Sequence, residues 1–387
     1  MVTIIKIIFG YYTKIYFSAY SIDYSFIKPL YDLDQSKKKL SILLNTKKNK
    51  NSLDDYFFYS ENLLLHKFLN LFTNNKISTT LKVYLNVFIL KIIVSYGKYD
   101  VLISGSTGLI NFRRNRKKLH IHIIHSMASL HTIYFHNSFY FYDYIFLTNQ
   151  KQLEELNLLK DKDKNLNASG KIMGYVDFNY NNFYFKKKDL NILIAPSWFR
   201  PDSFNNILQN HIINNLLSIK NIDIIYIRPH PGLSSNQLKS IEKIINLYDS
   251  KIKIQLSIGN SIQFDFQRSD IMITDCSGVG IQYALQNLTP TFFIKETPTK
   301  QNNKYFIDSK IKSLERDLSF NFGINVFFEK DQLHLNKLIS KYITSKKNQL
   351  EWKDKLLNSR KIFLKDSSNY PFDALKMIDN LLLEKQT

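Results

Sequence analysis

Short apolar runs alternate with longer amphipathic segments along most of the chain, and this pattern predicts the elements of the fold. Several runs are rich in Ile, Leu and Val with little polar alternation, which is typical of strands buried on both faces of a parallel sheet. Strands are expected at Leu40–Leu44, Val101–Ser104, His120–Ile124, Tyr144–Thr148, Lys171–Met173, Ile192–Ala195, Ile222–Ile227, Ile252–Gln255, Ile271–Thr274 and Thr291–Ile294. Helices are expected at Lys151–Leu159, Asp202–Ile219, Ser234–Leu247, Gly278–Asn287, Lys330–Ser345, Gln349–Leu364 and Pro371–Glu384.

The alternation of strand and helix occurs twice, which predicts two domains of the α/β class. We expect a first domain at 1–180, a second domain at 189–365 and a C-terminal helix at 366–387, with a basic linker at Asn179–Lys188. Each domain should be a doubly wound parallel sheet. If the two sheets face one another across a cleft, a ligand would bind at the carboxyl ends of their strands.

Composition adds a preference for anionic partners. The 387 residues include 53 Lys and Arg against 33 Asp and Glu, a formal net charge of +20. Such a charge favours a phosphorylated substrate, an acidic lipid surface or a nucleic acid. No nucleic-acid-binding motif is present, so nucleic acid is not expected as a partner. A chain rich in Lys, Asn and Ile is also basic for compositional reasons alone.

The single cysteine indicates the redox compartment of the protein. Cys276 has no second cysteine with which to form a disulfide or a cysteine-based zinc site, and a reducing cytoplasm fits best. We interpret it as a small filler rather than a nucleophile.

No segment has the about 18 to 20 uncharged apolar residues of a membrane span. Met1–Tyr20 interleaves aromatics with Lys6 and Lys14, so it could lie flat on an anionic membrane or be a buried part of the first domain.

The stretch SDIMITDCSGVGIQYAL places a Ser-Gly corner between a strand and a helix. A helix N-terminus leaves about four backbone N–H groups unpaired and has a partial positive charge. Ser277 could donate its hydroxyl and Gly278 would permit close backbone approach, which together suit a diphosphate. Asp275 would line the same corner. The alternative is an ordinary N-cap without a ligand.

Two further strand ends have chemically useful residues. IIYIRPHP ends in Arg228 and His230, which could bind phosphate oxygens, although a turn with two surface cations is the alternative. ILIAPSWFR supplies Ser197 and Arg200 as residues that could line the cleft. VLISGSTGL supplies Ser106 in a second small-residue corner, which lacks the lysine of an ATP-hydrolysing loop.

The stretch HIHIIHSMAS places His125 at the end of a strand of the first domain. A histidine on a rigid element at a cleft is well suited to act as a general base. His120 and His122 alternate with apolar residues on one face of that strand, and we interpret them as structural. No acid is adjacent, so a metal site is not expected.

In this order, these segments resemble the CDP-glycerol glycerophosphotransferase family, the teichoic-acid primases and polymerases with a GT-B fold. The resemblance covers residues 99–385, and RPHP at Arg228 to Pro231 is its most specific part. YIFLTNQKQLEEL, KIMGYVD, ILIAPSWF and SDIMITDCSGV also match. Ser126, Val176 and Gly278 replace a glycine, a proline and a second serine of the family pattern.

The resemblance implies a transferase that uses a nucleotide-diphosphate donor, CDP-glycerol, without a further cofactor or a metal. His125 would be the catalytic base, and His230 with Arg228 would contact the donor phosphates. Ser277 and Gly278 would hold the diphosphate. The acceptor would be a membrane-linked or polymeric hydroxyl in teichoic acid or capsule synthesis, so the protein would sit peripherally on the inner face of the membrane.

Two other interpretations remain from the sequence. Other GT-B glycosyltransferases would use the same phosphate site, and non-hydrolysing UDP-N-acetylglucosamine 2-epimerases resemble the chain at DCSGVGIQYA. Gln282 fits the epimerase pattern, but Tyr283 and Ala284 stand where those enzymes have two glutamates. A non-catalytic binder of polyanions or membranes is the alternative from a different class.

Overall fold

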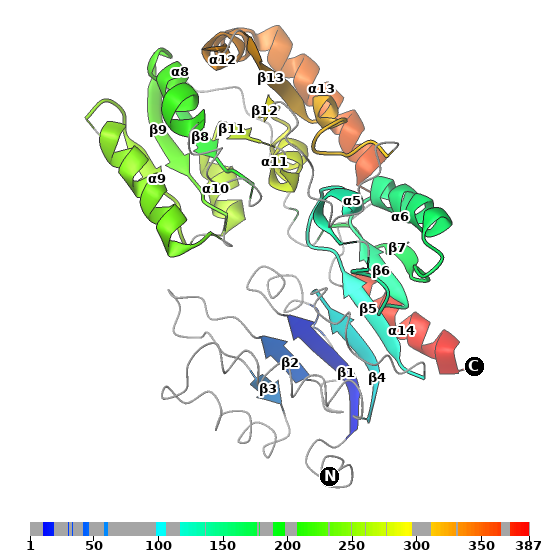
Figure 1. Cartoon of the computed structure of the whole chain (residues 1–387). Helices are drawn as coiled ribbons and strands as arrows, with labels where there is room; N and C mark the ends of the chain where they lie inside the picture. Colours follow the sequence, from blue (N-terminus) through cyan, green and yellow to red (C-terminus); the bar gives the residue numbers. More distant parts are fainter. Residues whose placement is uncertain are drawn as a thin grey trace, which may run out of the picture. The chain divides into compact units, whose positions relative to one another are not determined.

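The computed structural model describes two compact units (Figure 1). One unit comprises Met1–His125, Tyr134–Val176 and Leu364–Thr387, and the other comprises Ser126–Ile133 and Asp177–Phe363. The residues described are 11–18, 30, 33, 42–45, 58–60, 98–105, 117–135, 137–175, 178, 189–197, 207–230, 233–248, 250–259, 261–275, 277–295, 311–329, 332–364 and 372–386.

The first unit is built on a seven-stranded sheet with the order β3-β2-β1-β4-β5-β6-β7. Its strands are β1 (Tyr11–Ser18), β2 (Ile42–Asn45), β3 (Phe58–Ser60), β4 (Lys98–Ser104), β5 (Leu119–Ile123), β6 (Tyr144–Leu147) and β7 (Ser169–Ile172). All neighbouring pairs are parallel except β2 with β3. The strand order reverses between β1 and β4, so the sheet is doubly wound.

Helices from distant parts of the chain complete the first unit. α6 (Gln150–Lys162) begins at Asn149, whose side chain accepts a hydrogen bond from the backbone N–H of Gln152. α14 (Phe372–Gln386), the last element, packs Ala374, Ile378 and Leu381 into the cluster formed by the apolar residues of β4 and β5. The C-terminal helix therefore belongs to the first unit, although most of the chain before it belongs to the second.

The second unit has a seven-stranded sheet with the order β10-β9-β8-β11-β12-β13-β14. Its strands are β8 (Leu190–Ile194), β9 (Ile222–Ile227), β10 (Ile254–Leu256), β11 (Ile271–Thr274), β12 (Thr291–Lys295), β13 (Gly323–Glu329) and β14 (Gln332–Leu333). Only the last pair is antiparallel. The order reverses between β8 and β11, and such a switch point is where doubly wound sheets bind ligands.

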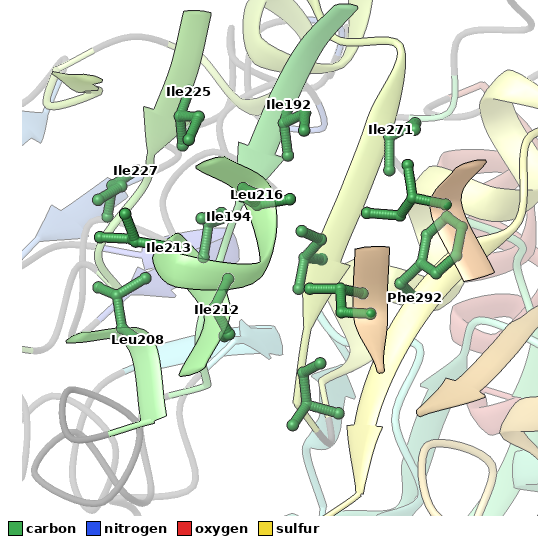
Figure 2. Packing of buried hydrophobic residues seen from close by; sticks show 14 of the residues in the cluster. Ile192, Ile194, Leu208, Ile212, Ile213, Leu216, Ile225, Ile227, Ile271 and Phe292 are labelled. Atoms are coloured by element: carbon green, nitrogen blue, oxygen red, sulfur yellow. The ribbon is translucent and has the colours of Figure 1, made fainter. Parts of the chain in front are cut away.

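Burial on both faces explains why β8 is a continuous apolar run. Ile192 and Ile194 lie in one cluster with the helical residues Leu208, Ile212, Ile213 and Leu216, as Figure 2 shows, whereas Leu193 packs on the other face against Phe266 and Tyr283. Each of these side chains, fully buried, contributes about 1.5–3 kcal/mol. The remaining elements are α5 (Leu130–Ile133), η2 (Leu208–Ile212), α8 (Ile213–Leu217), α9 (Ser235–Tyr248), α10 (Ile262–Arg268), α11 (Gly278–Asn287), η3 (Ser319–Asn321), α12 (Leu335–Thr344) and α13 (Lys346–Phe363).

All ten expected strands are present within a few residues of their expected bounds. The sequence patterns did not predict β1, β3, β13, β14, α5, η3 or α10. For this part of Met1–Tyr20 the structure agrees with the second alternative, because the backbone of Tyr11–Ser18 pairs with β2 on one side and with β4 on the other and is therefore an inner strand of the first unit. Among the helices that the structure describes, none has the length and hydropathy needed to cross a bilayer.

Candidate functional site

Two of the expected site residues bind one another at the switch point of the second sheet. Ser197 follows β8 and Asp275 follows β11, and these two strands are neighbours. The backbone N–H of Ser197 donates to Asp275 Oδ1 at 2.8 Å, and the Ser197 hydroxyl donates to Asp275 Oδ2 at 2.6 Å. The carboxylate therefore fixes the chain where it leaves β8 and orients the serine hydroxyl.

Arg228 stands at the end of β9, the next strand along, and its guanidinium is held in place. Its backbone N–H donates to the carbonyl of Ile194 at 2.8 Å, which continues the sheet pairing by one residue. Its Nη1 donates to Asp265 Oδ2 at 2.5 Å, and only 18% of the side chain is exposed. The alternative of a mobile surface cation therefore does not describe Arg228.

Asp265 is the centre of this arrangement, and its carboxylate is fully buried. Besides Arg228 it accepts from Arg268 Nη2 at 2.6 Å and from the hydroxyl of Ser257 at 2.7 Å. The guanidinium of Arg268 also lies over the ring of Tyr226, 3.6 Å from its centroid. Among the described residues, two ordered guanidinium groups share this one carboxylate. Ordered cationic groups at the carboxyl edge of the sheet favour an anionic ligand.

His230 lies two residues beyond Arg228, after the buried Pro229. Its backbone carbonyl accepts from the N–H of Leu233 at 3.0 Å. The ring of Pro229 fixes its own φ and disfavours helical backbone at Arg228 before it. His230 is half-buried and belongs to the same strand end as Arg228.

At the Ser-Gly corner, the Ser277 hydroxyl accepts a hydrogen bond from the N–H of Val279 at 3.4 Å, so Ser277 is the N-cap of α11. The cap does not prevent ligand binding, because a hydroxyl that accepts one hydrogen bond can still donate its own proton to a ligand. At the far end of the helix, Arg360 Nε donates to the carbonyl of Leu285 at 2.7 Å. Both ends of α11 are therefore stabilised.

Gly278 has a structural reason to lack a side chain. A Cβ at this position would lie 2.7 Å from Ser126 Oγ and 2.8 Å from the backbone nitrogen of Ala128. The close approach that the sequence predicted at Gly278 thus involves a loop of the chain itself, Ser126–Ala128. This loop belongs to the second unit, and it directly follows His125.

His125, the expected base, lies two residues beyond the end of β5 in the first unit. It is half-buried, and its backbone carbonyl accepts a hydrogen bond from the hydroxyl of Tyr175 at 3.2 Å. The chain leaves the first unit at this residue. The segment Ser126–Ile133, which begins at the next residue, belongs to the second unit.

The other two histidines of β5 are structural, as expected. His122 is fully buried among Tyr134, Phe139 and Tyr142, and burial together with the nearby His125 lowers the pKa of His122 to about 3. The imidazole is therefore neutral.

His120 lies near the start of β5 and binds Asp143, which in turn contacts the C-terminal helix. Its Nδ1 is 3.2 Å from Asp143 Oδ2 and its Nε2 is 3.1 Å from the hydroxyl of Tyr99. Asp143 is also 3.6 Å from Lys385 Nζ of α14. Burial, with Asp143 nearby, raises the pKa of Tyr99. These contacts lie at the amino end of β5, away from the strand ends that concern the site.

The expected cleft-lining residues Ser106 and Arg200, the cysteine Cys276 and the expected linker Asn179–Lys188 lie outside the part of the chain that the structure describes. Their roles stay predictions.

Sequence reasoning missed the acids that hold the site residues. Asp265 is followed three residues later by Arg268 in a segment with a Ser261 N-cap, so a helical ion pair was visible in principle. The bond between Asp265 and Arg228, 37 residues away, gives no signal in the sequence. Glu315 gives no signal in the sequence, yet it is buried and binds residues 183 and 186 positions earlier.

At the level of sequence, no protein-family model and no curated protein matches the chain. Solved structures match nearly all of it. The wall teichoic acid polymerase TagF has a TM-score of 0.55 at 14% identity, over 96% of this chain and 88% of that one; another TagF structure was soaked with CDPG. UDP-GlcNAc 2-epimerase from Neisseria meningitidis bound to UDP-GlcNAc has a TM-score of 0.58 at 13% identity, over 96% and 100%. S. aureus MnaA with UDP has a TM-score of 0.53 at 12% identity, over 88% and 91%.

These similarities and the two strand orders show that the chain has the GT-B fold, with a doubly wound parallel sheet in each unit and a helix at its C-terminus. The expected fold class is thereby confirmed. The likeness to TagF agrees with the family resemblance seen in the motifs. At 12–14% identity, the likeness of this chain to these three proteins concerns the fold alone.

Proposed function

We propose that this protein is a GT-B transferase that moves an alditol phosphate from a nucleotide-diphosphate donor, CDP-glycerol, to a hydroxyl group of a membrane-linked acceptor. The observation that carries the proposal is the cluster at the carboxyl edge of the second sheet. There Arg228, which follows β9, and Arg268 share Asp265, and only β8 separates β9 from β11, the strand that leads to the capped N-terminus of α11. A helix N-terminus and a fixed guanidinium are suited to a diphosphate.

In the proposed reaction, the oxygen of the acceptor hydroxyl attacks the phosphorus that bears the glycerol. The bond between this phosphorus and the oxygen bridging to CMP breaks, and CMP leaves with the electron pair. The hydroxyl proton passes to His125, which acts as the general base. Arg228, His230 and the N-terminus of α11, with Ser277 and Gly278, stabilise the charge that develops on the phosphates and on the leaving CMP.

A GT-B glycosyltransferase is the second candidate, because the same phosphate site would serve a nucleotide-sugar, with the attack at the anomeric carbon. The epimerase is less well supported, although its fold is similar. Tyr283 and Ala284 stand where the epimerase pattern has two glutamates, and both are fully buried. Tyr283 packs against Phe266 and donates to the carbonyl of Ser269, so its position has a role in the core.

A donor screen tests these assignments. Wild-type protein is incubated with CDP-glycerol, CDP-ribitol or UDP-GlcNAc, with and without a lipid-linked glycerol phosphate primer, and the released nucleotide is measured. We expect CMP release from CDP-glycerol that requires the primer. UMP or UDP release would indicate a different group transferred. Conversion of UDP-GlcNAc into its 2-epimer without nucleotide release would refute transfer.

We further propose that the protein works at the inner face of the cell membrane, where a lipid-linked acceptor would be found. The net charge of +20 supports attraction to anionic lipid, at about 1 kcal/mol for each Lys or Arg near the surface. Because Tyr11–Ser18 forms an inner strand, the attachment is not assigned to that segment. Flotation with anionic vesicles at low and high salt measures it, and protein that ignores such vesicles at low salt contradicts it.

A further inference from the structure

The segment Ser126–Ile133 follows the proposed base His125 directly and is packed into the second unit. Two separate sets of contacts hold it there. At its beginning, Ser126 and Ala128 lie against Gly278, at the first turn of α11. At its end, Ser129 and Thr132 bind Glu315, a residue 186 positions after Ser129.

Glu315 is suited to fix this segment. Its side chain is 2% exposed, and its two carboxylate oxygens accept different donors: Oε2 accepts from the N–H of Ser129 at 3.0 Å, and Oε1 accepts from the hydroxyl of Thr132 at 2.5 Å. Ser129 is the residue before α5, so the carboxylate caps that short helix. Hydrogen bonds to an ionised group are stronger than those between neutral groups. The Thr132 hydroxyl has only one proton, and the carboxylate is a better acceptor than the carbonyl of Ser129, which lies 2.9 Å away.

The loop around Glu315 is itself fixed to the sheet. Lys295, the last residue of β12, donates from Nζ to the carbonyls of Glu315 at 3.2 Å and Arg316 at 2.9 Å. The N–H of Leu314 donates to the hydroxyl of Ser129 at 2.8 Å, a reciprocal bond in the opposite direction. The contacts therefore run from the carboxyl end of β12 through Glu315 to the segment that begins one residue after His125.

We infer that Glu315 is a positioning residue for His125: it holds Ser126–Ile133 on the second unit and so restrains the backbone next to the base. Consecutive Cα atoms are about 3.8 Å apart, so His125 cannot move far from an anchored Ser126. Gly278 contacts the same loop and lies in the first turn of the helix whose N-terminus would hold the diphosphate. This inference depends on the proposed function for the role of His125, whereas the anchoring itself does not.

Three variants test the inference. Glu315→Ala removes both acceptors, Glu315→Gln keeps the volume but loses the charge, and Thr132→Val removes one hydrogen bond with little change in shape. Thr344→Val is the matched control for the last, because its hydroxyl donates to the carbonyl of Ser340 at 2.7 Å on an exposed helix. Glu351→Gln is the control for the glutamate, since Glu351 is exposed and 4.0 Å from Lys347.

The first readout is hydrogen exchange of the peptide covering Ser126–Ile133. We expect it to exchange about tenfold faster or more in Glu315→Ala and to a smaller degree in Thr132→Val, while peptides from β8 and β9 are unchanged. Unchanged exchange in both variants would overturn the anchoring. If Glu315→Ala does not fold, Thr132→Val decides this point, because it removes only one partly buried hydroxyl.

The second readout separates turnover from binding. We expect kcat for CMP release from CDP-glycerol to fall about 10- to 100-fold in Glu315→Ala, since a misplacement of about 1 Å can cost a hundredfold, whereas the Kd for CMP stays within about threefold. Faster exchange with normal kcat would refute the positioning role. If wild-type protein turned over no donor, the proposed function would fail, and the NMR signal of the His125 imidazole would decide in its place: a shifted or broadened signal in Glu315→Ala supports positioning, and an unchanged one overturns it.

Discussion

Arg228 and Arg268 offer an unusually well matched comparison for the proposed phosphate site. Both guanidinium groups bind the carboxylate of Asp265, at 2.5 and 2.6 Å, and their side chains are 18% and 17% exposed. Only Arg228 follows the end of a strand, whereas Arg268 lies in a helix over the ring of Tyr226. Replacing either by alanine removes one charge and leaves Asp265 with its other arginine and with Ser257.

The expected effects on nucleotide binding therefore differ although the two changes are similar. A charge-assisted hydrogen bond to a ligand contributes about 1.5–3 kcal/mol, so Arg228→Ala should raise the Kd for CMP by about 10- to 150-fold. Arg268→Ala should change it by about threefold or less. Neither variant should unfold the protein, because the buried carboxylate keeps a partner, whereas Asp265→Ala removes the carboxylate that both guanidinium groups bind and should cost about 3–5 kcal/mol of unfolding free energy.

Isothermal titration calorimetry with CMP measures the binding, and denaturation of the same samples measures the stability. Arg268→Ala also loses the cation–π contact with Tyr226, which contributes about 0.5–2 kcal/mol. The free energy of unfolding should therefore be lower for Arg268→Ala than for Arg228→Ala. Equal losses of affinity in both variants would show that net charge, and not contact with Arg228, determines binding. Unchanged affinity in Arg228→Ala would remove this residue from the site.

Three further predictions concern other parts of the molecule. His125→Ala should abolish transfer and leave the Kd for CMP within a few-fold, measured on the same preparation, and near-normal turnover would remove His125 from the mechanism. Gly278→Ala should cost about 1–3 kcal/mol of unfolding free energy because its Cβ would meet the backbone of Ala128, and adding Ser126→Gly should recover only a part. Since the pKa of His122 is lowered to about 3, the unfolded state takes up a proton below pH about 6.5 that the folded state refuses. The stability of wild type relative to His122→Asn should therefore be greatest above that pH and fall by about 1.4 kcal/mol per unit on acidification, and denaturation curves that stay parallel between pH 7 and 5.5 would contradict this.

The strands could be predicted because burial on both faces leaves a plain signal. Ile222–Ile227 and Ile271–Thr274 have the bounds that their apolar runs predict. β13, in contrast, has the sequence GINVFFE, where Phe327 is 60% exposed and Val326 is buried, so its pattern is mixed. β1 was ambiguous because Lys14 interrupts its apolar residues. Such interruptions do not distinguish an inner strand from a surface segment, and pairing with β2 and β4 decides the matter.

The site residues could be named from their places at strand ends, but their partners could not. Parallel strands bring their carboxyl ends to one edge, so a residue after β9 and one after β11 lie at the same edge of the sheet, with only β8 between their strands. Which acid holds Arg228 depends on how α10 packs beside the sheet, and which acid binds Ser129 depends on a loop 186 residues later. Neither follows from local pattern, because both are consequences of tertiary packing.

The overall charge of +20 is a weak guide to what this protein binds, and the fixed cations at the carboxyl edge are a stronger one. Arg228 and Arg268 are held by Asp265, and Lys295 is held by two carbonyls. A guanidinium that is already oriented loses less conformational entropy when it meets a phosphate than a mobile surface lysine does, and it selects for geometry. A binder of polyanions needs only many such mobile charges, and its affinity falls steeply with salt. The ordered cations therefore favour a defined nucleotide-diphosphate site over a diffuse basic surface.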